Sequence, residues 1–93
     1  MSKSYLEITR STSRALARLR ADQPELSRGF SALAQAALKE GALEVKTKEL
    51  IALALGVAAR CDACIGFHVQ ALIRHQVRRD ELEEALGMAA RVC

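Results

Sequence analysis

The sequence predicts an all-α fold: about five helices in a compact bundle that assembles as a homo-oligomer. Of the 93 residues, 51% are hydrophobic but only 3% are aromatic, with one Pro and five Gly. A core of Ala, Leu, Ile and Val favours helices over a β-sandwich. A small Ala-rich core without Trp also buries little area per residue, and chains of this size often need a partner subunit. Residues 1–93 are therefore expected to form a single domain that is stabilised by further copies.

The first three helices follow from apolar periodicity and from their start and stop signals. Residues 5–19 place apolar side chains on one side of a first helix. A second helix begins at Pro24, which is tolerated in the first turn, and ends near Gly41, a C-cap candidate. One face of this helix carries Leu26, Phe30, Leu33, Ala34, Ala37 and Leu38. Residues 44–59 form a third helix that is apolar nearly all round, which marks a buried central helix.

Two more helices complete the bundle. The fourth starts at about the cysteines Cys61 and Cys64 and runs to about residue 76. Asp80 followed by Glu83 is an N-cap signature for the fifth. The apolar pattern of the fifth helix continues to Cys93 without a stop signal. We therefore expect either that a partner subunit covers this end of the helix or that a further C-terminal segment follows.

Charge and hydropathy disfavour several classes of protein. The net charge is +3, and the arginines are not interleaved with aromatic residues, so a solvated face is expected rather than nucleic-acid binding. The polar start does not resemble a secretory signal. The longest apolar run, residues 50–59, is shorter than the roughly 20 residues that span a bilayer. A soluble, cytoplasmic protein is expected, without a membrane or nucleic-acid partner.

Cys61, Cys64 and His68 form the strongest candidate for chemistry. Cys64 and His68 are four residues apart and share a helix face, and Cys61 lies three residues before Cys64, on the same stripe or in the turn that enters the helix. A helix N-terminus favours the thiolate, and a nearby imidazole can accept the proton. This spacing predicts a dithiol that attacks an oxidant and then closes on itself.

The spacing alone leaves three interpretations open. One is the redox-active dithiol. Another is a metal site with Cys61, Cys64, His68 and Glu49 as ligands, although a structural zinc site usually has a closed set of four Cys and His ligands. The third is a pair of small core residues that fall at this spacing. Haem attachment is excluded because His does not directly follow Cys64.

Glu49 is a further candidate because it stands just before the apolar run. If it faces inward, its carboxylate is poorly solvated and can relay a proton to or from His68. The alternative is a solvent-facing Glu in an early helical turn, where the helix dipole favours a negative charge.

Together these residues resemble a known family. Glu49, Cys61, Cys64 and His68 match the E…C-x-x-C-x-x-x-H signature of the AhpD-like alkylhydroperoxidases, in the carboxymuconolactone decarboxylase superfamily. The segment from Lys46 to Ala54 (KTKELIALA) also resembles the family's K-T-x-E-L-I-A-L segment. The resemblance is clear over residues 41–90. Ala63 stands where some members carry a His or an aromatic residue.

The resemblance implies a thiol-dependent peroxidase that reduces organic hydroperoxides in antioxidant defence. By position, Cys64 would be the peroxidatic cysteine, Cys61 the resolving one, and His68 with Glu49 the proton relay. It also implies a trimer or hexamer, no bound cofactor or metal, and an external reductant such as a lipoylated or thioredoxin-like protein. The alternative is a non-catalytic, redox-sensing or metal-binding helical oligomer that uses the same cysteines.

Overall fold

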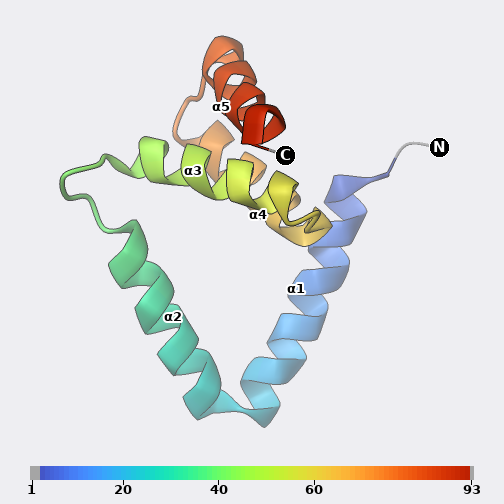
Figure 1. The fold of residues 1–93 in the computed structure, drawn as a ribbon. Coiled ribbons are helices and arrows are strands. Elements are labelled where there is room, and N and C mark those ends of the chain that lie inside the picture. Colours follow the sequence, from blue (N-terminus) through green and yellow to red (C-terminus); the bar gives the residue numbers. More distant parts are fainter. Residues whose placement is uncertain (1–2, 93) are drawn as a thin grey trace.

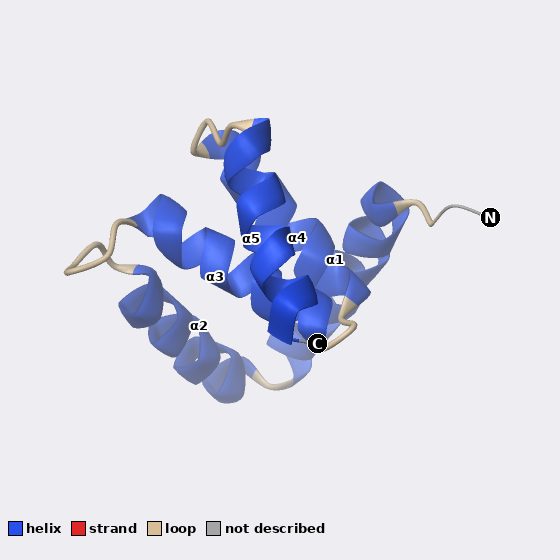
Figure 2. Ribbon diagram, turned by 45° about the horizontal axis from the view of Figure 1, so that its top comes forward, coloured by secondary structure: helices blue, strands red, loops and turns tan. Residues whose placement is uncertain are grey.

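In the computed structural model, which describes residues 3–92, the chain forms α-helices joined by short loops, with no strand in that range (Figure 2). This confirms the predicted all-α class. The helices are α1 (Tyr5–Asp22), α2 (Pro24–Leu38), α3 (Val45–Ala58), α4 (Asp62–Arg74) and α5 (Arg79–Val92).

The five helices do not close into one bundle. Helix α3 contacts α2, α4 and α5, and α1 packs on α4. Figure 1 shows α1 and α2 diverging from their shared turn as the two arms of a V, with α3, α4 and α5 gathered across its open end. The loop at residues 39–44 returns the chain from α2 to α3.

Burial within the single chain is concentrated where α1, α3, α4 and α5 meet. The fully buried apolar residues are Leu53, Leu72 and Ala89, and the buried polar ones are Thr9 and Glu49. Helix α2 has no buried residue. Its apolar face therefore stays largely exposed in the single chain, where α2 contacts α1 and α3 without burying any residue.

Helix α3 is also less buried than its composition predicts. Glu49, Leu53 and Gly56 are buried, but Ile51 and Leu55 stay exposed. Neighbouring helices cover only part of its circumference, because α2 leans away from it (Figure 1).

The end of α2 differs from the predicted cap. The helix ends at Leu38, and Gly41 does not take the left-handed conformation of a glycine cap. Instead, the Lys48 ammonium on α3 donates hydrogen bonds to the backbone carbonyls of Ala37 and Lys39. A side chain from another helix thus satisfies carbonyls that a glycine cap would otherwise satisfy.

Helix α5 begins two residues earlier than the Asp80–Glu83 pattern predicts, at Arg79. The Glu81 carboxylate accepts a hydrogen bond from the backbone N–H of Arg78 at 2.8 Å. Glu81 also pairs with Lys46 of α3, Nζ to Oε2 at 3.0 Å. These bonds lower the pKa of Glu81, with the Arg78 N–H as the largest cause. One carboxylate therefore both caps α5 and ties it to α3.

Helices α1 and α4 approach closely at Gly66. A Cβ added there would meet the Cγ2 of Thr9 on α1. The Thr9 hydroxyl donates to the carbonyl of Leu6 and accepts from the Gln70 amide on α4. Gly66 thus allows a contact that fixes how α1 crosses α4.

None of the described helices is long and apolar enough to cross a membrane.

Candidate active site

The turn between α3 and α4 places the first cysteine. Helix α3 ends at Ala58, and Arg60 adopts a left-handed conformation with φ of 56°. The backbone N–H of Cys61 then donates to the carbonyl of Gly56 at 2.9 Å. This reversal lays the start of α4 against the end of α3, with Cys61 as the N-cap of α4.

The two cysteines meet in the first turn of α4. Cys61 and Cys64 form a disulfide, with their Cα atoms 5.2 Å apart. The Cys61 sulfur also accepts a hydrogen bond from the backbone N–H of Cys64 at 3.2 Å. Free N–H groups and the positive end of the helix dipole gather here, and both stabilise a negatively charged sulfur.

Gly56 makes room for this pair on α3. A Cβ added at Gly56 would lie 3.1 Å from the Cβ of Cys64, tighter than an ordinary van der Waals contact. The absence of a side chain lets α3 approach the cysteine turn. Helical periodicity places Gly56 inside the third helix but does not indicate that its neighbour is Cys64.

The buried carboxylate of Glu49 pairs with the partly exposed imidazole of His68. Glu49 is 2% exposed, and its Oε2 lies 3.0 Å from Nδ1 of His68. A buried carboxylate is stabilised when it is paired and hydrogen-bonded. An ionised carboxylate accepts only, so the Nδ1 proton is donated to Glu49 and a neutral ring keeps the Nε2 lone pair free. Of the two predicted orientations of Glu49, the inward one is therefore observed.

His68 links this pair to the dithiol. It follows Cys64 by four residues within α4, so the two side chains lie on the same helix face. The His68 side chain is 31% exposed, which leaves one edge of the imidazole open. All four residues that the sequence singled out thus lie at the α3–α4 contact.

A pocket opens on the Glu49–His68 side of this cluster. Its volume is about 370 Å³, and its remaining lining is mainly apolar: Ala34, Ala37, Leu38, Lys48, Ile51 and Ala52. Neither cysteine lines this pocket. The α2 residues and Lys48 were missed as site residues by sequence reasoning, because their proximity depends on how α2 returns toward α3.

Two other features do not join this site. His75 is the exposed C-cap of α4, at the opposite end of that helix from the cysteines. Cys93 lies outside the described residues. Within residues 3–92, no group of three or more His, Cys, Asp and Glu side chains is arranged to hold a metal ion.

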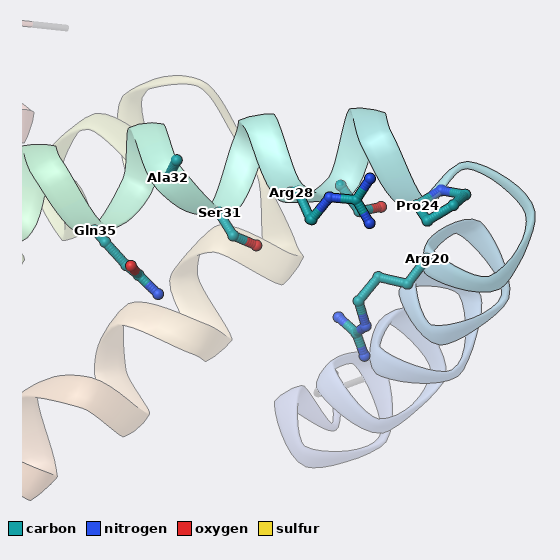
Figure 3. Close-up of a pocket in the computed structure, with 7 residues that line it drawn as sticks. Arg20, Pro24, Arg28, Ser31, Ala32 and Gln35 are labelled. Carbon is teal, nitrogen blue, oxygen red and sulfur yellow. The ribbon is translucent and has the colours of Figure 1, made fainter.

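A separate open pocket of about 440 Å³ lies where α1 meets α2. Figure 3 shows Arg20 of α1 near Pro24 and Arg28 of α2, with Ser31 and Gln35 farther along α2. Its lining contains no cysteine, histidine or carboxylate, so it offers none of the groups that peroxide or thiol chemistry needs.

The family model described as the carboxymuconolactone decarboxylase family matches residues 24–93. The chain therefore belongs to this family, and the AhpD-like resemblance drawn from its motif is confirmed. The family includes enzymes.

A solved relative agrees over nearly the whole chain. The crystal structure of an apo-form carboxymuconolactone decarboxylase family protein from Legionella pneumophila is 54% identical, with a TM-score of 0.95. The match covers 98% of this chain and 81% of that one.

Two curated relatives are uncharacterized proteins. One, from Cupriavidus necator, is 39% identical over 71% of this chain, and another, from Haemophilus influenzae, is 34% identical over 75%. The matched region spans 58% and 62% of those two proteins.

Proposed function

We propose that this protein is a thiol-dependent peroxidase that reduces organic hydroperoxides through a Cys61–Cys64 dithiol–disulfide cycle. The observation that carries the proposal is the contact of the buried Glu49 carboxylate with His68, one helical turn from a disulfide-bonded cysteine pair. A simple structural disulfide has no need of a buried proton relay beside it. A redox-active dithiol does, because protons must leave and return at each turnover.

The proposed cycle assigns one role to each side chain. Glu49 fixes the His68 tautomer, and His68 takes the proton of Cys64. The Cys64 thiolate attacks the peroxide O–O bond; the sulfur gains OH as sulfenic acid, and the alcohol leaves after taking up a proton. The Cys61 thiol then attacks that sulfur, a disulfide forms, and water leaves. The peroxide has then been reduced by two electrons.

An external dithiol closes the cycle. It reduces the Cys61–Cys64 disulfide by exchange and is itself oxidised to a disulfide. A lipoylated or thioredoxin-like protein has the required chemistry, and we include such a partner in the proposal. We also propose that the working form is a homo-oligomer, a trimer or hexamer, as in similar proteins. The cycle needs no bound cofactor.

Intact-mass spectrometry of the reduced protein after a small excess of organic hydroperoxide tests this proposal. Wild type should lose two hydrogens. Cys61→Ser should stop with one added oxygen on Cys64, whereas Cys64→Ser should show neither change at this pair. Cys93→Ser is the matched control and should behave as wild type.

Two results would overturn the peroxidase proposal. An inert wild type would leave the dithiol without a peroxide substrate. A stoichiometric metal ion that protects both sulfurs, and that is lost when either cysteine is replaced, would favour the metal-binding alternative.

A further inference from the structure

An ion pair joins the start of α1 to the turn that holds the dithiol. The ammonium of Lys3, which precedes α1, lies 2.8 Å from Oδ2 of Asp62, the first residue of α4. The two residues are 59 positions apart in the sequence, so only the packing of α1 on α4 brings them together. The hydrogen bond to Asp62, followed by the Coulomb attraction of that carboxylate, raises the pKa of Lys3, so the ammonium stays charged in the pair.

The packing of α1 on α4 brings this lysine to its place. Ser4 is the N-cap of α1, and its side chain accepts a hydrogen bond from the backbone N–H of Glu7, which fixes where the helix begins. A Cβ added at Gly66 of α4 would lie 3.5 Å from the carbonyl oxygen of Tyr5. Gly66 follows Cys64 by only two residues. The start of α1 therefore lies against the helix whose first turn holds the cysteines (Figure 1).

Asp62 is the only charged residue between the two cysteines. In the segment Cys61-Asp62-Ala63-Cys64, Ala63 has no ionisable group. Asp62 opens α4, so its carboxylate lies at the same positive helix end that stabilises a cysteine thiolate. Two negative groups at one helix end repel each other, and an unpaired Asp62 would therefore oppose the thiolate of the reduced pair. The disulfide carries no charge and escapes this repulsion.

Lys3 supplies the charge that offsets the repulsion. The side chains of Lys3 and Asp62 are 60% and 35% exposed, and an exposed ion pair contributes little to folding stability. Its local electrostatic effect is separate, because the ammonium neutralises the one carboxylate between the cysteines. The redox equilibrium of the pair depends on that local charge, since only the reduced cysteines can ionise.

We propose that Lys3 is a positioning residue that, held by Asp62, stabilises the thiolate of the reduced dithiol and thereby shifts its redox equilibrium toward the reduced form. The start of α1 then belongs to the redox site, although neither the cysteine motif nor the Glu49–His68 contact includes it. That this equilibrium serves peroxide turnover rests on the proposed function; the effect of the ion pair on the dithiol does not.

The equilibrium with dithiothreitol measures this effect. Reduced dithiothreitol gives two electrons and two protons to the Cys61–Cys64 disulfide, so the protein S–S bond breaks while dithiothreitol closes its own S–S bond. Acid quenching, alkylation and peptide mass spectrometry give the reduced fraction of the pair over a series of dithiothreitol ratios at one neutral pH. Cys93→Ser is present in every protein, so that no third thiol competes.

Two variants that break the same ion pair should shift this equilibrium in opposite directions. Lys3→Met leaves the Asp62 carboxylate uncompensated and should lower the equilibrium constant for reduction about threefold. Asp62→Asn removes the repulsion and should raise the constant by a similar factor. Lys3→Arg should keep the wild-type value. Lys39→Met is the matched control, because it removes the same charge from the exposed C-cap of α2.

The double variant tests whether Asp62 holds Lys3 in place. In the Asp62→Asn protein, Lys3→Met should have no further effect, because the exposed lysine has already lost the partner that positions it. The difference between wild type and Lys3→Met should also shrink in about 1 M salt, since exposed charges are screened at that ionic strength.

The direction of the shifts decides the outcome. A merely structural role would move Lys3→Met and Asp62→Asn the same way, and that result, or a folded Lys3→Met with the wild-type constant, would overturn the proposal. If Lys3→Met does not fold, Asp62→Asn alone still tests the sign, because an unchanged or lower constant contradicts the repulsion.

This test is independent of the peroxidase proposal, because it uses no peroxide. If the variants behave as expected but reduced Cys64 resists organic hydroperoxide, the peroxidase proposal fails and the role of Lys3 stands. If Cys64 reacts with the hydroperoxide but Lys3→Met and Asp62→Asn leave the equilibrium unchanged, only the role of Lys3 fails.

Discussion

At the scale of single residues, the buried charge of Glu49 is the feature with the largest consequence. Its carboxylate is 2% exposed and pairs with His68 at 3.0 Å. Burying a carboxylate is costly, and one hydrogen bond to a partly exposed imidazole offsets only part of that cost. The presence of Glu49 beside a dithiol is therefore better explained by proton transfer than by folding.

Glu49→Gln should slow the reaction of reduced Cys64 with an organic hydroperoxide by about 100-fold, because general acid–base groups typically contribute that much or more. The amide keeps the shape of the side chain but cannot stabilise an imidazolium. Stopped-flow kinetics of thiol loss measure the rate. The control is Glu44→Gln, at the exposed N-cap of the same helix, which should leave the rate unchanged. Equal rates in both variants would show that Glu49 is not part of the relay.

At the scale of elements, the crossing of α1 over α4 depends on Gly66 and Thr9. Gly66→Ala places a methyl group against the Thr9 Cγ2 and should destabilise the protein by about 1–3 kcal/mol in urea unfolding. Thr9→Ser removes that methyl and keeps the hydroxyl that bonds Leu6 and Gln70. The double variant, Gly66→Ala with Thr9→Ser, should therefore recover most of the lost stability.

Gly87→Ala is the control for this pair. Nothing lies within 4 Å of a Cβ added at Gly87, and the residue is in the middle of α5. Alanine should stabilise that helix by about 1 kcal/mol through helix propensity. If Gly66→Ala were as stable as Gly87→Ala, the close crossing of α1 and α4 would be contradicted.

Lys48 joins α2 to α3 at the loop end of the V. Lys48→Met removes the hydrogen bonds to the carbonyls of Ala37 and Lys39 and keeps the aliphatic stem. The last turn of α2 should then exchange its amides about tenfold faster, and Lys48→Arg should restore part of the protection. Lys39→Met, an exposed lysine nearby, should have little effect. Unchanged amide exchange in Lys48→Met would mean that other contacts hold the last turn of α2 in place.

The stability of the protein should depend on pH through Glu81 at the start of α5. Its pKa lies below the usual 4.5 in the folded protein, so its contribution to stability is present above that value. The contribution is lost as pH falls through the folded pKa. Glu81→Gln should therefore be less stable than wild type at neutral pH, and the difference should shrink under strongly acidic conditions. Glu83→Gln, at a more exposed acid of the same helix, should show a smaller effect in the same urea titrations.

At the scale of the whole molecule, stability should depend on protein concentration. A single chain exposes about 1,900 Å² more than a compact monomer of its mass, and the proposed homo-oligomer would gain stability by covering that surface. The midpoint of thermal unfolding should therefore rise with concentration in calorimetry of the full chain. A midpoint that stays constant over a wide concentration range would indicate a self-sufficient monomer.

Much of this architecture follows directly from the sequence. Apolar periodicity and the Pro24 start place the helices within a few residues of where they lie. The spacing of Cys61, Cys64 and His68 is local, so a single helix of 3.6 residues per turn brings them together. Their place at the start of α4 could therefore be predicted without knowledge of any neighbour.

Three features were decided by the tertiary structure alone, because each depends on residues far apart in the chain. The inward orientation of Glu49 depends on how α3 packs against α4. The Lys48 bonds depend on how the loop returns α2 to α3. The exposure of α2 also depends on long-range packing, because periodicity shows that a helix has an apolar face but does not show what covers it. Local sequence patterns thus determine the helices and the spacing of the two cysteines. Long-range packing determines the Glu49–His68 contact, the α2 wall of the pocket and the open groove between α1 and α2.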